Sequence, residues 1–79
     1  MTHWNYRIMR RKGYYGDGED HYGIYEVYYA DDGSVDGWTD RPMEPNGQTL
    51  DEIEGDMIYM KMAFDHPVLD YETGKDVNS

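Results

Sequence analysis

The chain has 79 residues, no cysteine, and 17 acidic against seven basic residues, which gives a formal net charge of −10 at pH 7. A chain this short forms one small domain with a thin margin of stability, and without cysteine it has no disulfide, thiolate–metal site or catalytic thiol. No stretch has the pattern of a signal peptide or a membrane span, so we expect a cytoplasmic protein.

The charge is unevenly distributed along the chain. The first twelve residues contain four bases and no acid, so residues 13–79 carry a net charge of −14. Low hydrophobicity with high net charge is typical of disorder, but nine tyrosines and two tryptophans supply large rings for a core. We therefore expect a folded acidic domain that avoids nucleic acid and anionic membranes and is attracted to basic surfaces.

Two strands are predicted in the first third of the chain. Residues 3–11 alternate, with Trp4, Tyr6 and Ile8 on one side, which favours a strand. Residues 12–21 contain three glycines and three acids and are expected to form an exposed hairpin loop. The stretch 22–29 (YGIYEVYY) holds β-branched and aromatic residues and predicts the middle strand of a sheet.

A turn and a third, shorter strand follow the middle strand. Asp32-Gly33 is a hairpin signal, and residues 35–39 (VDGWT) predict the strand. A two-residue turn would place Trp38 opposite Val27, and we favour this register. A bulged three-residue turn would instead place Trp38 opposite Glu26, on the other face of the sheet.

A helix is predicted after a connector at 40–48 that contains two prolines. Thr49 is an N-cap candidate with Glu52 three residues on, the pattern of a capping box. Pro67 sets a limit, so the helix should end near Phe64 or Asp65. An apolar stripe at helical spacing is expected to pack on the sheet and consists of Leu50, Ile53, Met57, Met60 and Phe64.

These elements predict an α+β fold: a three-stranded antiparallel meander with one helix packed across one face (β-β-β-α). Residues 1–71 would form the domain and 72–79 a flexible C-terminal tail, with Val68-Leu69 as a short extended segment on the core. One helix stripe covers one face only, so the other face is expected to be solvated or bound to a partner.

No constellation of catalytic or metal-binding residues stands out. His3, His21 and His66 share no metal-ligand spacing, and the acids at 17–20 and 31–36 lack the spacing of a calcium loop. No nucleophile motif or phosphate-binding glycine loop is present. We therefore expect no enzyme activity, no metal and no cofactor.

The acids are the main functional signal, and two interpretations are open. They form either a solvated surface that keeps the protein soluble, or a phosphate-like surface that occupies a basic nucleic-acid-binding groove on another protein. The second interpretation requires acids on rigid elements, at the hairpin turn and the start of the helix. The candidate partner-binding residues are Asp31, Asp32, Asp36, Asp51, Glu52, Glu54 and Asp56.

Short motifs over most of the chain resemble a widespread family of small bacterial proteins without an assigned function. The motifs are W-N-Y-R-I (4–8), Y-G-I-Y-E-V-Y-Y (22–29), D-G with G-W-T (32–33, 37–39), T-L-D-E-I (49–53) and P-V-L-D-Y (67–71). This resemblance implies the order of hairpin and helix and brings no catalytic or ligand residues with it. In size, acidity and lack of cysteine, the chain is also similar to phage-encoded anti-CRISPR proteins that mimic DNA.

The resulting prediction is an acidic DNA-mimic inhibitor of a basic DNA-binding protein, most specifically an anti-CRISPR protein that blocks DNA binding by a type I effector complex. It would be a monomer in the host bacterial cytoplasm, without direct contacts to nucleic acid or membrane. The alternative is a housekeeping protein–protein interaction module that uses an exposed, tyrosine-rich sheet face.

Overall fold

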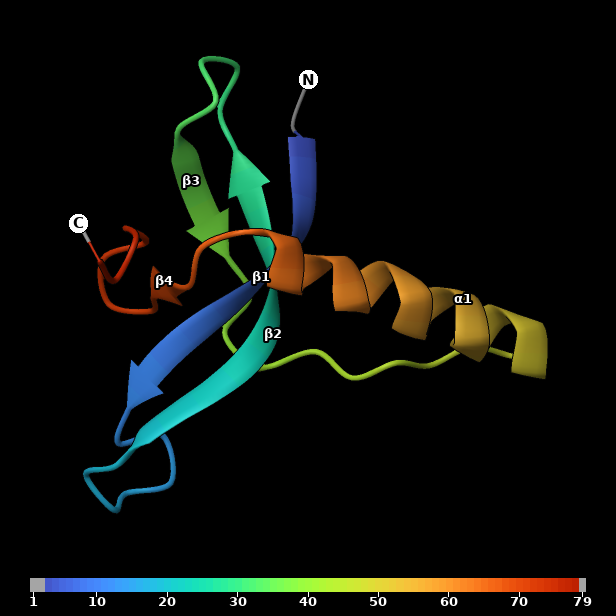
Figure 1. The fold of residues 1–79 in the computed structure, drawn as a ribbon, viewed down its shortest axis with the longest axis horizontal. Coiled ribbons are helices and arrows are strands. Elements are labelled where there is room, and N and C mark those ends of the chain that lie inside the picture. The colour runs from blue at the N-terminus through green and yellow to red at the C-terminus, as the bar shows by residue number, and fades with distance from the viewer. Residues whose placement is uncertain (1–2, 79) are drawn as a thin grey trace.

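The computed structural model describes residues 3–78 and shows a curled four-stranded sheet from which one helix projects (Figure 1). The fold is α+β as expected, but the sheet has four strands where three were predicted. The added strand pairs in parallel with the first strand, and the spatial order is β3-β2-β1-β4. The elements are β1 (His3–Lys12), β2 (Asp20–Tyr29), β3 (Val35–Trp38), α1 (Leu50–Lys61), the 3₁₀ turn η1 (Met62–Asp65) and β4 (Leu69–Asp70).

A long antiparallel ribbon of β1 and β2 forms the centre of the sheet. Its register runs from His3 opposite Tyr29 to Lys12 opposite Asp20. Opposed residues share a face, so the even-numbered residues of both strands lie on one face and the odd-numbered residues on the other. This parity distributes the apolar residues of YGIYEVYY between two sides of the sheet.

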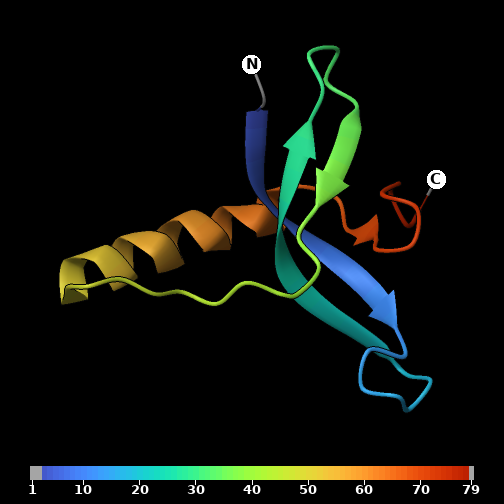
Figure 2. The same ribbon diagram turned by 180° about the vertical axis from the view of Figure 1, so that it is seen from behind.

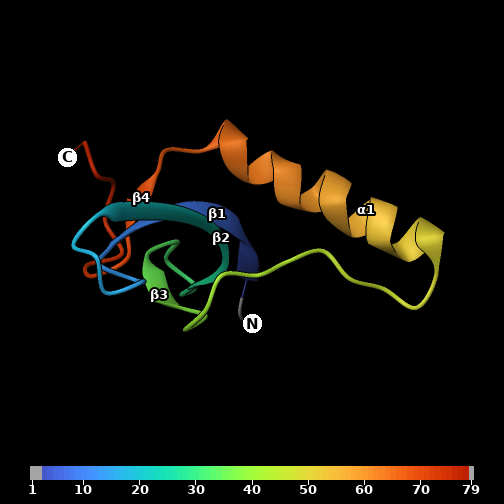
Figure 3. The ribbon, with the colours of Figure 1, turned by 90° about the horizontal axis from the view of Figure 1, so that it is seen from below.

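Each face of the ribbon has its own core. On the even face Tyr6 and Ile8 pack with Met60 and Ala63 from the end of α1 and from η1. The odd face was expected to be solvated or bound to a partner, and this expectation is wrong. The curl of the sheet and the C-terminal segment enclose that face (Figure 3), and its buried residues are Met9, Tyr25, Val27 and Leu69.

The β2–β3 connection confirms the predicted pairing of Trp38 with Val27 by a different route. The turn has three residues, with Gly33 at φ +86° and the amide of Ala30 bonded to the carbonyl of Ser34 at 2.9 Å. A bulge then shifts the register between Tyr28 and Tyr29. The extra residue in the turn and the extra residue in the bulge cancel, so Trp38 stays on the odd face with Val27.

Residues 72–78 form contacts that the sequence did not reveal. The amide of Asp70 donates to the carbonyl of Lys75 at 2.7 Å, and that of Val77 donates to the carbonyl of Val68 at 3.0 Å. Gly74 is buried against Trp38. The mobility predicted for residues 72–79 stays a prediction, but the backbone of 72–78 is folded onto the sheet.

Helix α1 begins where the sequence indicated. The side chain of Thr49 accepts a hydrogen bond from the amide of Glu52 at 3.1 Å, which confirms the predicted N-cap. The helical region ends at Asp65 in η1, as Pro67 requires. Within residues 3–78, no helix combines the length and apolarity needed to cross a membrane.

The predicted packing of α1 across the sheet is wrong. The helix points away from the sheet, and its C-terminal end alone reaches the core (Figures 1 and 2). Of the predicted stripe, Met60 is 3% exposed, whereas Leu50 is 86%, Met57 56% and Phe64 70% exposed. The side of α1 that packs on the sheet and the connector is rotated about the helix axis by roughly 60° from the centre of the predicted stripe.

Candidate functional site

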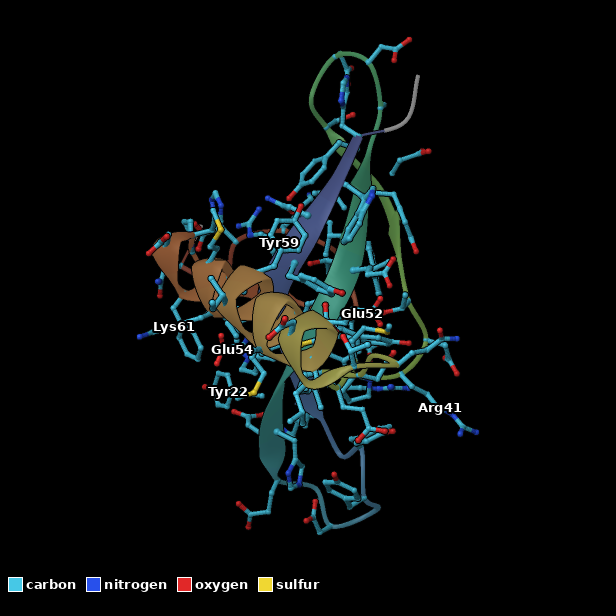
Figure 4. All side chains as sticks on the ribbon, turned by 90° about the vertical axis from the view of Figure 1, so that its right-hand side faces the viewer. Tyr22, Arg41, Glu52, Glu54, Tyr59 and Lys61 are labelled. Carbon is cyan, nitrogen blue, oxygen red and sulfur yellow. The ribbon has the colours of Figure 1, made fainter. Side chains whose placement is uncertain are left out.

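A polar cleft of about 580 Å³ lies between α1, the connector that precedes it and the even face of the sheet. It opens on the side of α1 where Glu52 projects, opposite the side where Glu54 and Lys61 project (Figure 4). No Lys, Arg or His is among the described residues that line it. The lining residues are Tyr6, Glu26, Met43, Asn46, Gly47, Glu52, Gly55, Asp56 and Tyr59.

Hydrogen bonds to the connector hold two of the cleft's carboxylates in place. The amide of Gln48 donates to Oε2 of Glu52 at 2.7 Å, and the amide of Asn46 donates to Oδ2 of Asp56 at 3.1 Å. The helix acids therefore fasten the connector along α1. Both donors are neutral amides, so they leave the two negative charges uncompensated.

The third carboxylate, Glu26, comes from β2. It accepts a hydrogen bond from the hydroxyl of Tyr28 at 3.0 Å, and Asp56 accepts one from the hydroxyl of Tyr6 at 3.3 Å. Three carboxylates from two elements thus line one cleft, and they accept hydrogen bonds from tyrosine hydroxyls and backbone amides, which are neutral. A carboxylate has more acceptor positions than these bonds use, so each can also accept from an incoming cation.

Aromatic rings form the remaining wall of the cleft. Tyr6 and Tyr59 meet edge to face with ring centroids 5.3 Å apart, and Trp4 packs on both rings at 5.2 Å and 5.7 Å. Tyr6 is buried, whereas Tyr59 is partly exposed at the rim. A ring face beside carboxylates favours a guanidinium or ammonium group, which the ring quadrupole attracts.

Two tyrosines that contact these acids have raised pKa values. Burial, together with the charge of Asp56, raises the pKa of Tyr6 to about 12. Burial and the hydrogen bond to Glu26 also raise the pKa of Tyr28. Both shifts mean that a further negative charge is disfavoured here. The part of each shift that comes from the charges of Asp56 and Glu26, and not the part that comes from burial, favours a positive charge.

The seven predicted partner-binding acids do not form one surface. Glu52 and Asp56 lie in the cleft, whereas Glu54 projects from the opposite side of α1 (Figure 4) and Asp51 is exposed in the first helical turn. The other three, Asp31, Asp32 and Asp36, are exposed on the β2–β3 hairpin, well away from α1 in Figure 1.

Asp32 has a local structural role within that hairpin. It accepts hydrogen bonds from the hydroxyl of Ser34 at 2.6 Å and from the amide of Ser34 at 2.9 Å. These bonds, the hydroxyl first, hold the pKa of Asp32 below its usual value. The carboxylate therefore stabilises the turn as well as adding to the acidic surface.

Sequence reasoning missed Glu26, Tyr6 and Tyr59. Glu26 is the only acid in the otherwise apolar stretch 22–29, and that isolation is the signal that could have identified it. The convergence of these residues depends on how α1 leaves the sheet, which no local pattern specifies.

The basic residues of β1 contact hydroxyl and carbonyl oxygens and aromatic rings as well as an acid. Arg7 donates to the hydroxyl of Tyr29 at 2.9 Å and to the carbonyl of Pro67 at 2.8 Å. The guanidinium of Arg11 lies over the rings of Tyr71 and Tyr14, at 3.9 Å and 4.5 Å from their centroids. Arg10 forms an ion pair, at 3.6 Å with Asp70. The side chains of Arg7 and Arg11 therefore contact groups on the odd face and in the loops around it, and not the cleft acids.

Over the part of the chain that the structure describes, no group of three or more His, Asp or Glu side chains could hold a metal ion. No protein-family model, curated protein or solved structure matches the chain. The resemblances of the sequence to known proteins therefore remain expectations.

Proposed function

We propose that the protein functions by binding a basic surface of another protein, and that the cleft beside α1 receives an arginine or lysine side chain from it. One observation carries the proposal: Glu26, Glu52 and Asp56 converge with the rings of Tyr6 and Tyr59 where the described lining residues include no base. Carboxylates supply bidentate acceptors for a guanidinium, and the tyrosines supply ring faces for it.

A basic groove that binds DNA is the kind of surface we propose as the target. Such grooves are lined with Lys and Arg and bind DNA largely by neutralising phosphates and releasing counterions. A protein with a net charge of −10 is attracted by the same field. Occupation of the groove would exclude DNA, so the protein would act as an inhibitor. The specific target that we propose is the DNA-binding surface of a type I CRISPR effector complex.

The two acidic regions have different parts in this proposal. The cleft acids are held by hydrogen bonds on α1 and β2, so they bind without the entropic cost of ordering a flexible segment. The exposed hairpin acids Asp31, Asp32 and Asp36 contribute to long-range attraction. Neutralisation of the cleft should therefore slow association and speed dissociation, whereas neutralisation of the hairpin should mainly slow association.

The test is a pull-down against DNA-processing and CRISPR effector proteins, followed by competition with a DNA duplex. The cleft variant is Glu26→Gln, Glu52→Gln and Asp56→Asn, which removes three charges and keeps the shape of each side chain. The matched control, Asp31→Asn, Asp32→Asn and Asp36→Asn, removes three charges from the hairpin. We expect DNA to compete, salt to weaken binding, and the cleft variant to lose far more affinity than the control.

A second measurement tests the cleft without a known partner. A triarginine peptide, titrated into the protein and followed by NMR, should shift the ring signals of Tyr6 and Tyr59 in the wild type and leave them unchanged in the cleft variant. A partner that binds DNA and this protein simultaneously, with an affinity indifferent to salt and to the cleft acids, would refute the proposal.

The alternative, an interaction module that uses a tyrosine-rich sheet face, has less structural support. Tyr25 is buried, and the hydroxyl of Tyr29 donates to Asn5 at 2.7 Å and accepts from Arg7. These tyrosines belong to the core and its hydrogen bonds. Tyr22 of β2 is exposed, but most of the large exposed apolar side chains lie on α1 and η1.

A further inference from the structure

One side of α1 exposes apolar side chains at heptad spacing. Leu50, Met57 and the η1 residue Phe64 recur every seven residues and are all exposed, as is the neighbouring Ile58 at 63%. Met57, Ile58 and Phe64 border an apolar groove of about 530 Å³ that Pro45 and Ile24 also line. Residues seven positions apart lie on one side of a helix, and the sheet of its own chain does not cover these side chains.

The exposed surface area of the chain is larger than that of a compact monomer of the same mass. The chain exposes 5727 Å² at a mass of 9.3 kDa, and compact monomers of that mass expose about 5000 Å². Its radius of gyration is 13.3 Å, against about 11.6 Å for a compact domain of this length. The excess area of roughly 700 Å² is close to the share that one partner contributes to a standard interface.

The charges beside the stripe are arranged symmetrically about its centre. Glu54 and Lys61 project from the same side of α1 (Figure 4), and both line the apolar groove. The midpoint between positions 54 and 61 falls between Met57 and Ile58. If a second α1 packs antiparallel about that point, Glu54 of each copy faces Lys61 of the other, and Leu50 of each copy lies one position away from facing Phe64 of the other.

We propose that this side of α1 is the interface of a two-fold symmetric homodimer with antiparallel helices. Met57 and Ile58 pack at the symmetry axis, and two Glu54–Lys61 pairs fix the orientation. The proposal replaces the monomer expected from the sequence. A second copy fits the stripe because it supplies the same residues in reverse order, so the surface is self-complementary in both apolar contacts and charge.

The dimer leaves the cleft acids free. Glu52 projects from α1 on the side away from Glu54 and Lys61 (Figure 4), so the proposed dimer and the proposed binding of a basic partner use different surfaces. Salt distinguishes the two, because two chains of −10 repel each other and screening strengthens their association. The same screening weakens binding to a basic partner.

Sedimentation equilibrium of the full chain and its charge variants tests the dimer. We expect the wild type to dimerise, and Glu54→Lys or Lys61→Glu alone to raise the dimer Kd about tenfold, because each places like charges together at two symmetric positions. The double variant Glu54→Lys/Lys61→Glu should restore the dimer. Asp36→Lys and Lys75→Glu make the same charge changes elsewhere and control for net charge.

A wild type that stays monomeric at submillimolar concentration would overturn the proposal. A double variant that dimerises as weakly as the single variants would also overturn it.

Cross-linking tests the orientation of the helices, and the cysteine-free chain makes it simple. Met57→Cys, oxidised, should form a disulfide-linked dimer, and Asp36→Cys should not. A mixture of Leu50→Cys and Phe64→Cys chains should cross-link to each other, whereas Leu50→Cys alone should stay unlinked. Efficient linking of Leu50→Cys to itself would show parallel helices and overturn the antiparallel interface.

Discussion

Gly74 lies so close to the indole of Trp38 that no side chain fits at position 74. A Cβ there would be 2.5 Å from Cζ3 of Trp38, and the residue has a φ of +73°. Trp38 belongs to β3 at one edge of the sheet, and Gly74 follows β4 at the other edge. The contact therefore brings the two edges of the curled sheet together over the odd-face core.

A substitution at Gly74 should destabilise the fold for two reasons that can be separated. Gly18 has the same φ of +73° but nothing within 4 Å of its Cβ position. Gly18→Ala should therefore cost about 1 kcal/mol for backbone strain alone. Gly74→Ala adds the clash with Trp38 and should cost about 3 kcal/mol or more. Urea unfolding of both variants measures the difference, and equal costs would mean that the C-terminal segment is not packed on Trp38.

Two methionines of α1 should differ strongly in how far the same substitution destabilises the fold. Met60 is 3% exposed in the even-face core, so Met60→Asp buries an unpaired charge and should cost more than about 4 kcal/mol. Met57 is 56% exposed, so Met57→Asp should change the stability of the isolated chain by about 1 kcal/mol or less. Denaturant unfolding in dilute solution makes the comparison. Loss of folding in Met57→Asp under those conditions would mean that α1 packs across the sheet after all.

Tyr6 should make the fold sensitive to alkaline pH. Its pKa is raised from 10.0 to about 12, so the folded state keeps the phenol protonated where the unfolded chain ionises it. This contribution to stability is fully present below about pH 10 and is lost as pH rises towards 12. Tyr6→Phe should flatten that part of the stability curve.

Asp56→Asn provides the companion measurement. It should lower the pKa of Tyr6, because the charge of Asp56 is the largest cause of the shift after burial. Ultraviolet difference spectra of tyrosine ionisation follow both variants. A wild type in which all nine tyrosines titrate together at the ordinary value would contradict the prediction.

Added salt should stabilise the folded chain at neutral pH. Residues 13–79 carry a net charge of −14, and the cleft acids accept hydrogen bonds from neutral groups, so repulsion among carboxylates opposes compaction. Screening weakens that repulsion over distances of about 10 Å at 0.1 M salt. Thermal melts at one dilute protein concentration should shift upward over this range. A steady fall in the melting temperature would show that paired charges outweigh the repulsion.

Local patterns in the sequence determined the elements of this protein. Period-two alternation identified β1, and β-branched and aromatic residues identified β2. The favoured pairing of Trp38 with Val27 is correct, although the two-residue turn from which it was derived is wrong. Thr49 and Pro67 marked the two ends of the helical region. Each of these signals acts within a few residues, through the geometry of a pleat, a cap or a proline ring.

Tertiary contacts decided where those elements lie. The spacing of the apolar stripe did not reveal that Met60 would be its one buried member. The stripe has more apolar residues than the sheet of the same chain covers. The parallel pairing of β4 and the contact of Gly74 with Trp38 join residues far apart in the sequence. The cleft likewise depends on the path of α1, which brings Asp56 to Glu26 across thirty positions of sequence. A pattern of residue types carries no information on such distances, since they follow from which surfaces pack together once the strands and helix exist.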